Sequence, residues 1–406
     1  MERIDIFKFL KTENINSIQL AFCDVYGREK NITIAPEELS QAFDYGISIN
    51  AGSVPDFGEG IYNDLLLHPE PDTIAEIPFQ SEENRSVRMF CSMSYPDGTP
   101  FTTRGTKSIL VQAIKEAEEM GFEFFFGTEI EFYLFRNDEN GLPTKEPYDQ
   151  AGFLDIAPQD KCGNLRREIS RALEFMDVFP SNTYHQTGPG QNEFDFSLNY
   201  PLVAGNNVIT AKSAIRNGAA RRNLTADFSP RPLEGKPANG MHITFSIRGN
   251  DGSDSALPYA IAGLLDKVSE MALFLTPFES SYERINKSGS LKYVSWSSEN
   301  RNQLFRLPER VGKYRIAELR SPDPAANPYL AYALIIHAAL YGIKNQLEMP
   351  NVTNFDLASA SDEVKSRYKK YPTSFDEACE LARNSEFIKS IVHQDIIDMY
   401  AKKRNG

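Results

Sequence analysis

The chain has 406 residues, of which 41% are hydrophobic and 24% are charged, and its formal net charge is -13 at pH 7. This length exceeds what one typical hydrophobic core needs, so two domains are expected. The acidic balance argues against nucleic acid and against an anionic membrane surface as partners, because both are bound by clusters of Lys and Arg.

The cysteines and the apolar segments exclude further classes of protein. The four cysteines lie far apart and form no CxxC pair, which argues against a zinc ribbon and against a disulfide framework. The longest apolar run, residues 330–340, is about half of a membrane span and contains His337, so a buried helix is expected there. No secretory signal is recognisable at the start, so a cytoplasmic location is expected.

The first residues of the chain predict a small α+β unit. Apolar residues alternate over 18–22 and again over 32–34, and the turn residues Asp24–Gly27 lie between them. This pattern is typical of a β-hairpin. Residues 46–80 are rich in Gly, Asp and Pro, and we expect long loops there, which are often functional when they are ordered.

A turn signal at Tyr95–Gly98 is the predicted boundary between domain 1–95 and domain 96–406. After it, helix and strand patterns alternate. Apolar residues at helical spacing predict a helix that ends at Gly121, and another helix is expected to begin near Asn164. Further helices are expected at 258–275, 327–346 and 375–402.

Four predicted strands have a chemically unusual polar face. They are residues 128–135, 192–198, 241–247 and 315–320. Because side chains alternate across a strand, Glu129 and Glu131 share one face, with their carboxylates roughly 7 Å apart. The other three strands present Glu193, His242 and Glu318 in turn.

These polar faces have two interpretations. They could simply meet water, as in any antiparallel sheet. If all four line one cavity, their carboxylates repel one another unless cations lie between them. Carboxylates with one imidazole suit Mg²⁺ or Mn²⁺, and the lack of thiolates argues against structural zinc.

Five arginines form a second candidate group: Arg284, Arg301, Arg306, Arg315 and Arg320. Each alone is expected to be a solvated surface charge. Together, beside a metal site, they could bind phosphates and a carboxylate through two parallel hydrogen bonds each. No P-loop or Rossmann glycine motif occurs, so a nucleotide would be held by metals and arginines instead.

Six short motifs occur together in the second region: GTEIEF at 127–132, GQNE at 190–193, NGMH at 239–242 with Ser246, NR at 300–301, ELR at 318–320 and DPAANPY at 323–329. With them the chain resembles the type I glutamine synthetase family over nearly its whole length. The resemblance implies an α+β fold, with an N-terminal β-grasp domain and a catalytic domain built on a curved antiparallel sheet with flanking helices.

The resemblance also implies an assembly and a reaction. The family forms homo-oligomers, as a ring hexamer or as stacked rings, with sites between neighbouring subunits. The chain lacks the C-terminal tail that locks two rings together, so weaker stacking is expected. In the family, ATP phosphorylates the side-chain carboxylate of glutamate, and an amine then displaces phosphate.

Residue roles follow from the resemblance, motif by motif. The implied ligands of Mg²⁺ or Mn²⁺ are Glu129, His242 and Glu318 for one ion, and Glu131, Gln186 and Glu193 for a second. The implied nucleotide and phosphate contacts are Thr244, Ser246, Arg301 and Arg306, with Arg315 as a replacement for a family arginine. The implied catalytic residues are Arg284, Arg301 and Arg320, with Asn50 and Asp64 from a loop lent to a neighbouring subunit.

Several departures from the family lie on the ammonia side of the site. Asn50 replaces the loop Asp that accepts a proton from ammonium, and an amide cannot act as a base. Gln186 replaces the third carboxylate of the second cation, which should therefore bind more weakly or be absent. The flap at 286–290 has no acid, and Pro237-Ala238 replaces a glutamate-facing Asn-Gly.

Three functions remain open at this point. The first is a ligase that joins glutamate, or a related carboxylate, to an amine other than ammonia, because the lost acids leave room for a larger amine. The second is a true glutamine synthetase with a rearranged site. The third is a non-catalytic family member that binds nucleotide or a partner. Release of ADP on addition of amines would separate the first two functions from the third.

Overall fold

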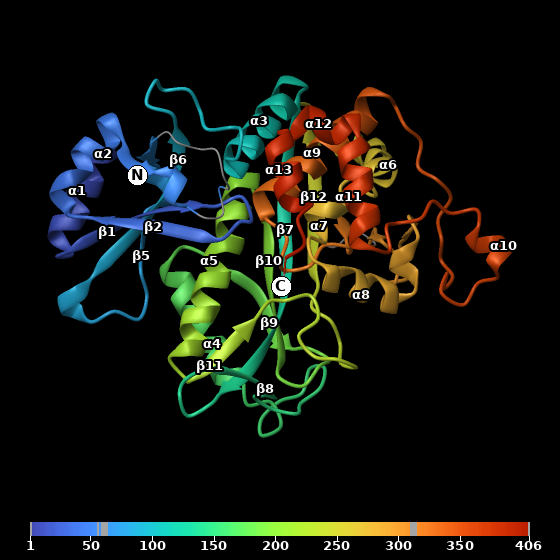
Figure 1. Cartoon of the computed structure of the whole chain (residues 1–406), viewed down its shortest axis with the longest axis horizontal. Coiled ribbons are helices and arrows are strands. Elements are labelled where there is room, and N and C mark those ends of the chain that lie inside the picture. Colours follow the sequence, from blue (N-terminus) through green and yellow to red (C-terminus); the bar gives the residue numbers. More distant parts are fainter. Residues whose placement is uncertain (1, 55–56, 58–63, 309–314, 405–406) are drawn as a thin grey trace.

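The structure, a computed structural model of the whole chain, describes residues 2–54, 57, 64–308 and 315–404. They form two sheets with helices around them, one in the N-terminal region and one in the larger C-terminal region (Figure 1). In this described part of the chain, no helix is long and apolar enough to cross a membrane.

The first sheet has six strands in the order β2-β1-β6-β4-β3, with β5 beside β6. Helices α1 (Arg3–Thr12) and α2 (Leu39–Tyr45) lie beside it, at the left of Figure 1, and bury Leu10 and Phe43. Strand β1 is antiparallel to β2 and parallel to β6. The strands are β1 (Ser17–Cys23), β2 (Glu29–Ile34), β3 (Ile47–Asn50), β4 (Asp64–Pro69), β5 (Ala75–Glu76) and β6 (Ser86–Ser94).

The predicted hairpin is present as β1 and β2. Its turn is closed by the Asp24 carboxylate, which accepts hydrogen bonds from the backbone N–H groups of Tyr26 and Arg28, each at 2.9 Å. The same turn contacts the second region, because Asn327 Nδ2 donates a hydrogen bond to Val25 O at 3.0 Å. The hairpin therefore helps to hold the two regions together.

The prediction of long loops at 46–80 is wrong in part. Strands β3 and β4 form an antiparallel pair inside this segment, and β4 also pairs with β6. The run of three leucines in β4 shows no alternation in the sequence, although Leu65 and Leu67 are fully buried and the leucine between them is not. Short strands without visible alternation give too weak a signal to separate them from loops.

The second sheet has nine strands in the order β13-β14-β15-β12-β7-β10-β9, with β8 and β11 beside β7. All its pairs are antiparallel except β13 with β14. The strands are β7 (Phe122–Asn137), β8 (Pro143–Pro147), β9 (Pro180–His185), β10 (Gln191–Asn199), β11 (Leu224–Asp227), β12 (Met241–Gly249), β13 (Trp296–Ser297), β14 (Phe305–Arg306) and β15 (Ala317–Leu319).

The apolar face of this sheet packs against helices. Ile130 and Phe132 of β7 are fully buried, and Phe126 stacks on Tyr332 of α9 with 4.3 Å between ring centroids. The polar face of the same strands is thereby left to build the site, as the alternation predicts. The helices are α3 (Thr106–Glu119), α4 (Gly163–Phe175), α5 (Pro201–Ala220), α6 (Leu257–Lys267), α7 (Ala272–Leu275), α8 (Glu279–Ser288), α9 (Pro328–Lys344) and α10 (Asp362–Lys365).

Helices α6 and α9 cross closely, and two glycines make the crossing possible. A Cβ atom on Gly263 would lie 2.2 Å from Ala338 O, and one on Gly342 would lie 2.1 Å from Tyr259 O. No side chain fits at such distances, so a substitution at either glycine would push the helices apart.

The helices predicted at 258–275 and 375–402 are each divided. The first becomes α6 and α7, and the second becomes α11 (Phe375–Asn384), α12 (Glu386–Ile391) and α13 (Gln394–Tyr400). Ser385 begins a new helix because its Oγ accepts a hydrogen bond from Ile388 N at 2.9 Å. His393 caps the next one by accepting from Asp395 N at 3.3 Å. A side-chain cap can end one helix and begin another while the helical spacing of apolar residues continues, so this spacing does not reveal the break.

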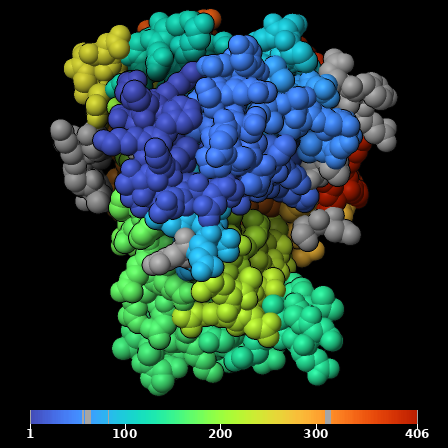
Figure 2. Space-filling view, turned by 90° about the vertical axis from the view of Figure 1, so that its left-hand side faces the viewer, coloured from blue at the N-terminus to red at the C-terminus, as the bar shows by residue number. Residues whose placement is uncertain are grey.

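The two regions are in close contact. Figure 2 shows the N-terminal region, in blue, lying directly against the green part of the second region. The first sheet ends with β6 and the second begins with β7, on either side of the predicted boundary. The division into domains at residues 95 and 96 stays a prediction.

Candidate active site

Three neighbouring strands bring together Glu129 of β7, His242 of β12 and Glu318 of β15, which we call the first cation group. His242 is directly opposite Glu129 in the register, and Glu318 is opposite Thr244. His242 Nδ1 lies 3.0 Å from Glu129 Oε2 and 3.9 Å from Glu318 Oε1. The polar faces predicted from the alternation of these strands therefore meet at one point.

The first cation group suits a hard divalent cation. Adjacent ligands of a cation with bonds of about 2.1 Å lie about 3 Å apart, and two carboxylates with one imidazole are suitable ligands. The separation of His242 Nδ1 and Glu129 Oε2, 3.0 Å, matches this spacing. The ligand atoms of Glu129, His242 and Glu318 all lie within 4.8 Å of one another. These residues therefore fit the Mg²⁺ or Mn²⁺ that the family implies.

Positive charges surround the first cation group. Burial raises the pKa of Glu129, but the hydrogen bond and charge of His242, with Arg320 and Arg306, outweigh burial and hold that pKa below its usual value. Glu318 is 2% exposed, and it pairs with Arg306 at 3.1 Å and with Arg320. Glu129 is therefore kept in the ionised form that a cation ligand needs.

Glu131, Gln186 and Glu193 also come together, and we call them the second carboxylate group. Glu131 and Glu193 are directly opposite each other on β7 and β10, and they are 7% and 1% exposed. Burial and the charge of Glu131 raise the pKa of Glu193 to about 7. Gln186 lies between them and donates hydrogen bonds to both carboxylates.

Two residues at this end of the site were not selected from the sequence. Asp195 is opposite Glu129 in the register, and its buried Oδ1 has no hydrogen-bond partner among the described residues. Burial, then the charges of Glu193 and Glu129, raise its pKa to about 8. Tyr184 hydrogen-bonds to Glu193. The alternation of β10 was the available signal for Asp195, because it places this residue on the same face as Glu193.

A cavity of about 320 Å³ opens beside both groups, and three of the five predicted arginines line it. Glu131 and His242 line it, together with Arg284, Arg301 and Arg320. Three further cationic side chains line it that were not among the predicted site residues: Arg231, Lys236 and Lys287.

Arg284 is fixed at the base of this cavity. Its guanidinium donates hydrogen bonds to Ser321 O at 2.6 Å and to Arg320 O at 2.9 Å. Burial lowers its pKa from the usual value. A buried guanidinium with these two anchors is a rigid donor for an anionic ligand.

Of the residues predicted to contact the nucleotide, some lie beside the first cation group and Arg315 is exposed. Thr244 and Ser246 follow His242 on the same face of β12, and Ser246 is 3% exposed. Arg306 is attached to Glu318, as described above. Arg315 is exposed, and the segment before it, 309–314, lies outside the described residues.

Asn50 and Asp64 are not brought to this site within one chain. They are opposite each other on β3 and β4 of the first sheet, both are exposed, and neither lines the cavity of the second sheet. The expectation that they complete the site of a neighbouring subunit stays a prediction.

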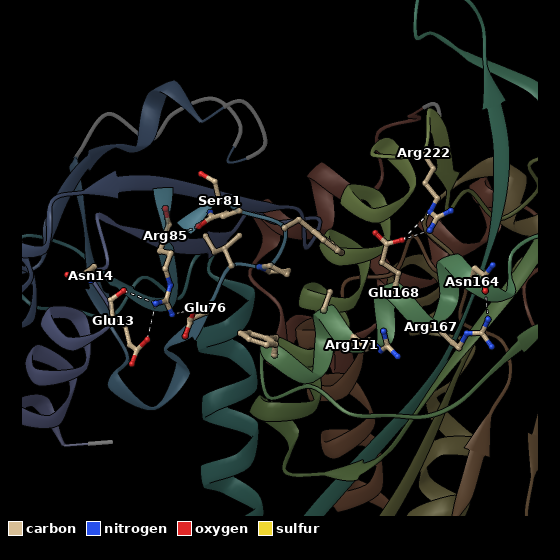
Figure 3. Close-up of a pocket in the computed structure, with 17 residues that line it drawn as sticks. Glu13, Asn14, Glu76, Ser81, Arg85, Asn164, Arg167, Glu168, Arg171 and Arg222 are labelled. Atoms are coloured by element: carbon tan, nitrogen blue, oxygen red, sulfur yellow. Dashed lines mark hydrogen bonds and ion pairs between the residues drawn. The ribbon is translucent and has the colours of Figure 1, made fainter. Parts of the chain in front are cut away.

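A larger cavity, of about 890 Å³, lies between the first sheet and α4 (Figure 3). Its charged side chains are mostly paired with one another. Arg85 pairs with Glu13 and Glu76 at 2.9 and 2.7 Å, and Arg222 pairs with Glu168 at 2.6 Å. The cavity contains no group of metal ligands among the described residues, so its size alone does not make it the reaction site.

Comparison with known families agrees with this site. The model of the glutamine synthetase catalytic domain matches residues 103–406, and the model of the glutamine synthetase β-grasp domain matches residues 14–96.

Curated relatives match over almost the full length. A glutamine synthetase of Methanosarcina mazei is 34% identical, with 98% of this chain and 92% of the relative covered. A glutamine synthetase of Staphylococcus aureus is 32% identical, with 99% and 93% covered. Among solved structures, that of GmaS without ligand and that of a GmaS/ADP complex each have a TM-score of 0.85 at 20% identity, with 98% of this chain and 94% of that chain covered. At this identity the likeness to GmaS shows the fold alone.

Proposed function

Because this chain belongs to the glutamine synthetase family of ATP-dependent ligases that form C–N bonds, we propose that it joins glutamate, or a close relative of glutamate, to an amine other than ammonia. The family, the α+β fold and the enzyme class expected from the sequence are confirmed. The choice of carboxylate and of amine is the proposal.

The cavity beside the two groups supports anionic substrates. Six of its lining side chains are Arg or Lys, and Glu131 is its one acid among the described residues. The donor carboxylate and the phosphates of ATP are anions, and arginine binds both through a planar fork of N–H groups. Arg284 and Arg320 are the proposed contacts of the donor, and Arg301 and Arg306 are the proposed contacts of the phosphates.

In the proposed reaction, an oxygen of the donor carboxylate attacks the γ-phosphorus of ATP, and ADP leaves. The amine nitrogen then attacks the carbonyl carbon of the acyl phosphate, phosphate leaves with the bonding electron pair, and the nitrogen gives a proton to a base. Glu129, His242 and Glu318 would hold a divalent cation, which when bound neutralises charge on the transferring phosphoryl group. Thr244 and Ser246 are the proposed nucleotide contacts beside it.

The observation that carries the choice of amine is the charge of this cavity, whose described lining includes six Arg or Lys side chains and one acid, Glu131. An ammonium ion is held mainly by negative charge, and each nearby charge contributes on the order of 1 kcal/mol. Asn50 replaces the loop acid of the family, and the flap at 286–290 has no acid, while its Lys287 lines the cavity. A substituted amine can recover the lost affinity through apolar contact, with Asp64 or a water-linked carboxylate as its base.

A true glutamine synthetase is the second candidate. It is favoured by the curated relatives, which are glutamine synthetases at 31 to 34% identity over nearly the whole chain. A non-catalytic role has no such support, because the first cation group and its arginines remain assembled.

The test compares acceptors at fixed ATP and glutamate. The apparent KM for ammonium is measured beside those for methylamine, ethanolamine and a diamine, and products are identified by mass. We expect a KM for ammonium at least about tenfold above that of the preferred organic amine, from the loss of one or two charges. A submillimolar KM for ammonium with no organic amine preferred would identify an ordinary glutamine synthetase.

A further inference from the structure

The second carboxylate group contains a pair of buried like charges. Glu131 and Glu193 are directly opposite each other in neighbouring strands and are almost fully buried. Two carboxylates at such a position repel each other unless something positive, or several hydrogen-bond donors, lies between them. The family implies a divalent cation at this point.

In this chain a side-chain amide lies at that point instead. Gln186 Nε2 donates to Glu193 Oε2 at 2.6 Å and to Glu131 Oε1 at 3.2 Å. Both N–H bonds of the amide group are therefore used by the two carboxylates that would otherwise hold the cation. Gln186 is held in place at the end of β9, because its backbone N–H donates to Gln191 O at 2.8 Å.

The orientation of this amide is fixed by its neighbour. Gln186 Oε1 accepts hydrogen bonds from Thr187 N at 2.7 Å and from Thr187 Oγ1 at 2.8 Å. The reversed orientation would set the amide oxygen against two carboxylates and the NH₂ group against an N–H donor. Each contact therefore points to the same assignment, with N–H groups facing Glu131 and Glu193.

Both carboxylates also accept hydrogen bonds from other residues. Glu131 Oε2 accepts from Gly240 N at 2.8 Å and from Gln191 Nε2 at 3.2 Å. The Tyr184 hydroxyl bonds to Glu193. Each N–H or O–H donor stabilises a charged acceptor, so these hydrogen bonds offset part of the repulsion between the two carboxylates without a cation.

We propose that the side-chain amide of Gln186 takes the place of the family's second cation, so that each site binds one divalent cation, at Glu129, His242 and Glu318. To bind there, a second cation would have to break both hydrogen bonds that Gln186 donates to Glu131 and Glu193. The amide oxygen would also have to rotate away from Thr187 to become a ligand. It would then find two carboxylates instead of three. This inference rests on the proposed function only in taking the first cation group and its neighbouring cavity as the reaction site.

The test counts cations in the full-length protein without nucleotide. Free Mn²⁺ is followed by electron paramagnetic resonance during titration of the wild type, of Gln186→Glu, of Gln186→Ala and of Gln41→Glu, whose change is at an exposed glutamine of α2. We expect one tight site per subunit in the wild type and in Gln41→Glu. Gln186→Glu should gain a second site, with affinity at least about tenfold above any second site of the wild type.

Gln186→Ala removes the amide without supplying a ligand, so a weak second site there and a tight one in Gln186→Glu would support the inference. Two tight sites in the wild type would overturn it. So would no gain in Gln186→Glu, provided that circular dichroism shows that variant to be folded. Because no acceptor is used, a preference for ammonia with one tight site refutes only the proposed function, and an organic amine with two tight sites refutes only this inference.

Discussion

The first cation group and the second carboxylate group lie on neighbouring strands of one sheet, yet their carboxylates are neutralised in different ways. Glu129 and Glu318 contact His242, Arg306 and Arg320, which are charged or can be, and which can also serve a bound ligand. The carboxylates of the second group contact neutral N–H donors that belong to the fold. Acids that one sheet brings together can therefore form a cation site or a hydrogen-bond network.

The largest effect is expected from His242→Ala. It removes one of three ligands from the first cation group, and even changes to residues behind the ligands cost about 10- to 100-fold in metal affinity. Mg²⁺-dependent affinity for ATP should fall by at least about 100-fold. Calorimetric titration of ATP with and without Mg²⁺ measures it, with Gln41→Glu, at an exposed position of α2, as the control that should change little. Unaltered Mg²⁺-dependent affinity in His242→Ala would refute the assignment of this group.

An intermediate effect should distinguish Glu129→Gln from Glu131→Gln, two identical changes on one strand. Glu129→Gln should lose tight Mn²⁺ binding and keep most of its stability. Glu131→Gln should keep the tight Mn²⁺ site and lose on the order of 1 to 3 kcal/mol in its free energy of unfolding, because an NH₂ group would face the N–H donors of Gly240 and Gln191. Urea unfolding and Mn²⁺ titration measure both quantities. If the two variants behave alike, the contrast between the groups is wrong.

The smallest effect is expected from Thr187→Val. It removes the hydroxyl that holds Gln186 Oε1 and leaves the backbone N–H. One hydrogen bond contributes about 0.5 to 1.5 kcal/mol, so weak binding of a second Mn²⁺ should tighten by about twofold to tenfold as the amide becomes free to present its oxygen. Thr187→Ser keeps the hydroxyl and should match the wild type. Unchanged weak binding in the valine variant would mean that the hydroxyl does not hold the amide.

Much of the fold could be predicted from local patterns. The hairpin of β1 and β2, the helices α3, α4 and α9, and the family were evident from alternation, helical spacing and motifs. The prediction was wrong at β3 and β4 within 46–80, where the alternation is too weak to reveal a strand. It was also wrong at Ser385 and His393, where side-chain caps divide a helix that apolar spacing predicts to be continuous. Strand pairing and helix capping depend on partners that periodicity does not reveal.

The candidate site was predicted in part for the same reason. Alternation placed Glu129 and Glu131 on one face, and motifs implied that His242 and Glu318 would join Glu129, as they do. The resemblance placed the segments of Lys236 and Lys287 near the site, but only the folded structure shows that both side chains line the cavity.

The sequence by itself determined the family, the strand faces that present the acids of both groups, and the exchange of an acid for the amide of Gln186. Only the tertiary structure decided what that amide does. Its N–H groups meet two carboxylates from different strands while its oxygen meets Thr187. An amide has a donor end and an acceptor end, and which end faces a site is set by partners that come together only when β7, β9 and β10 are paired.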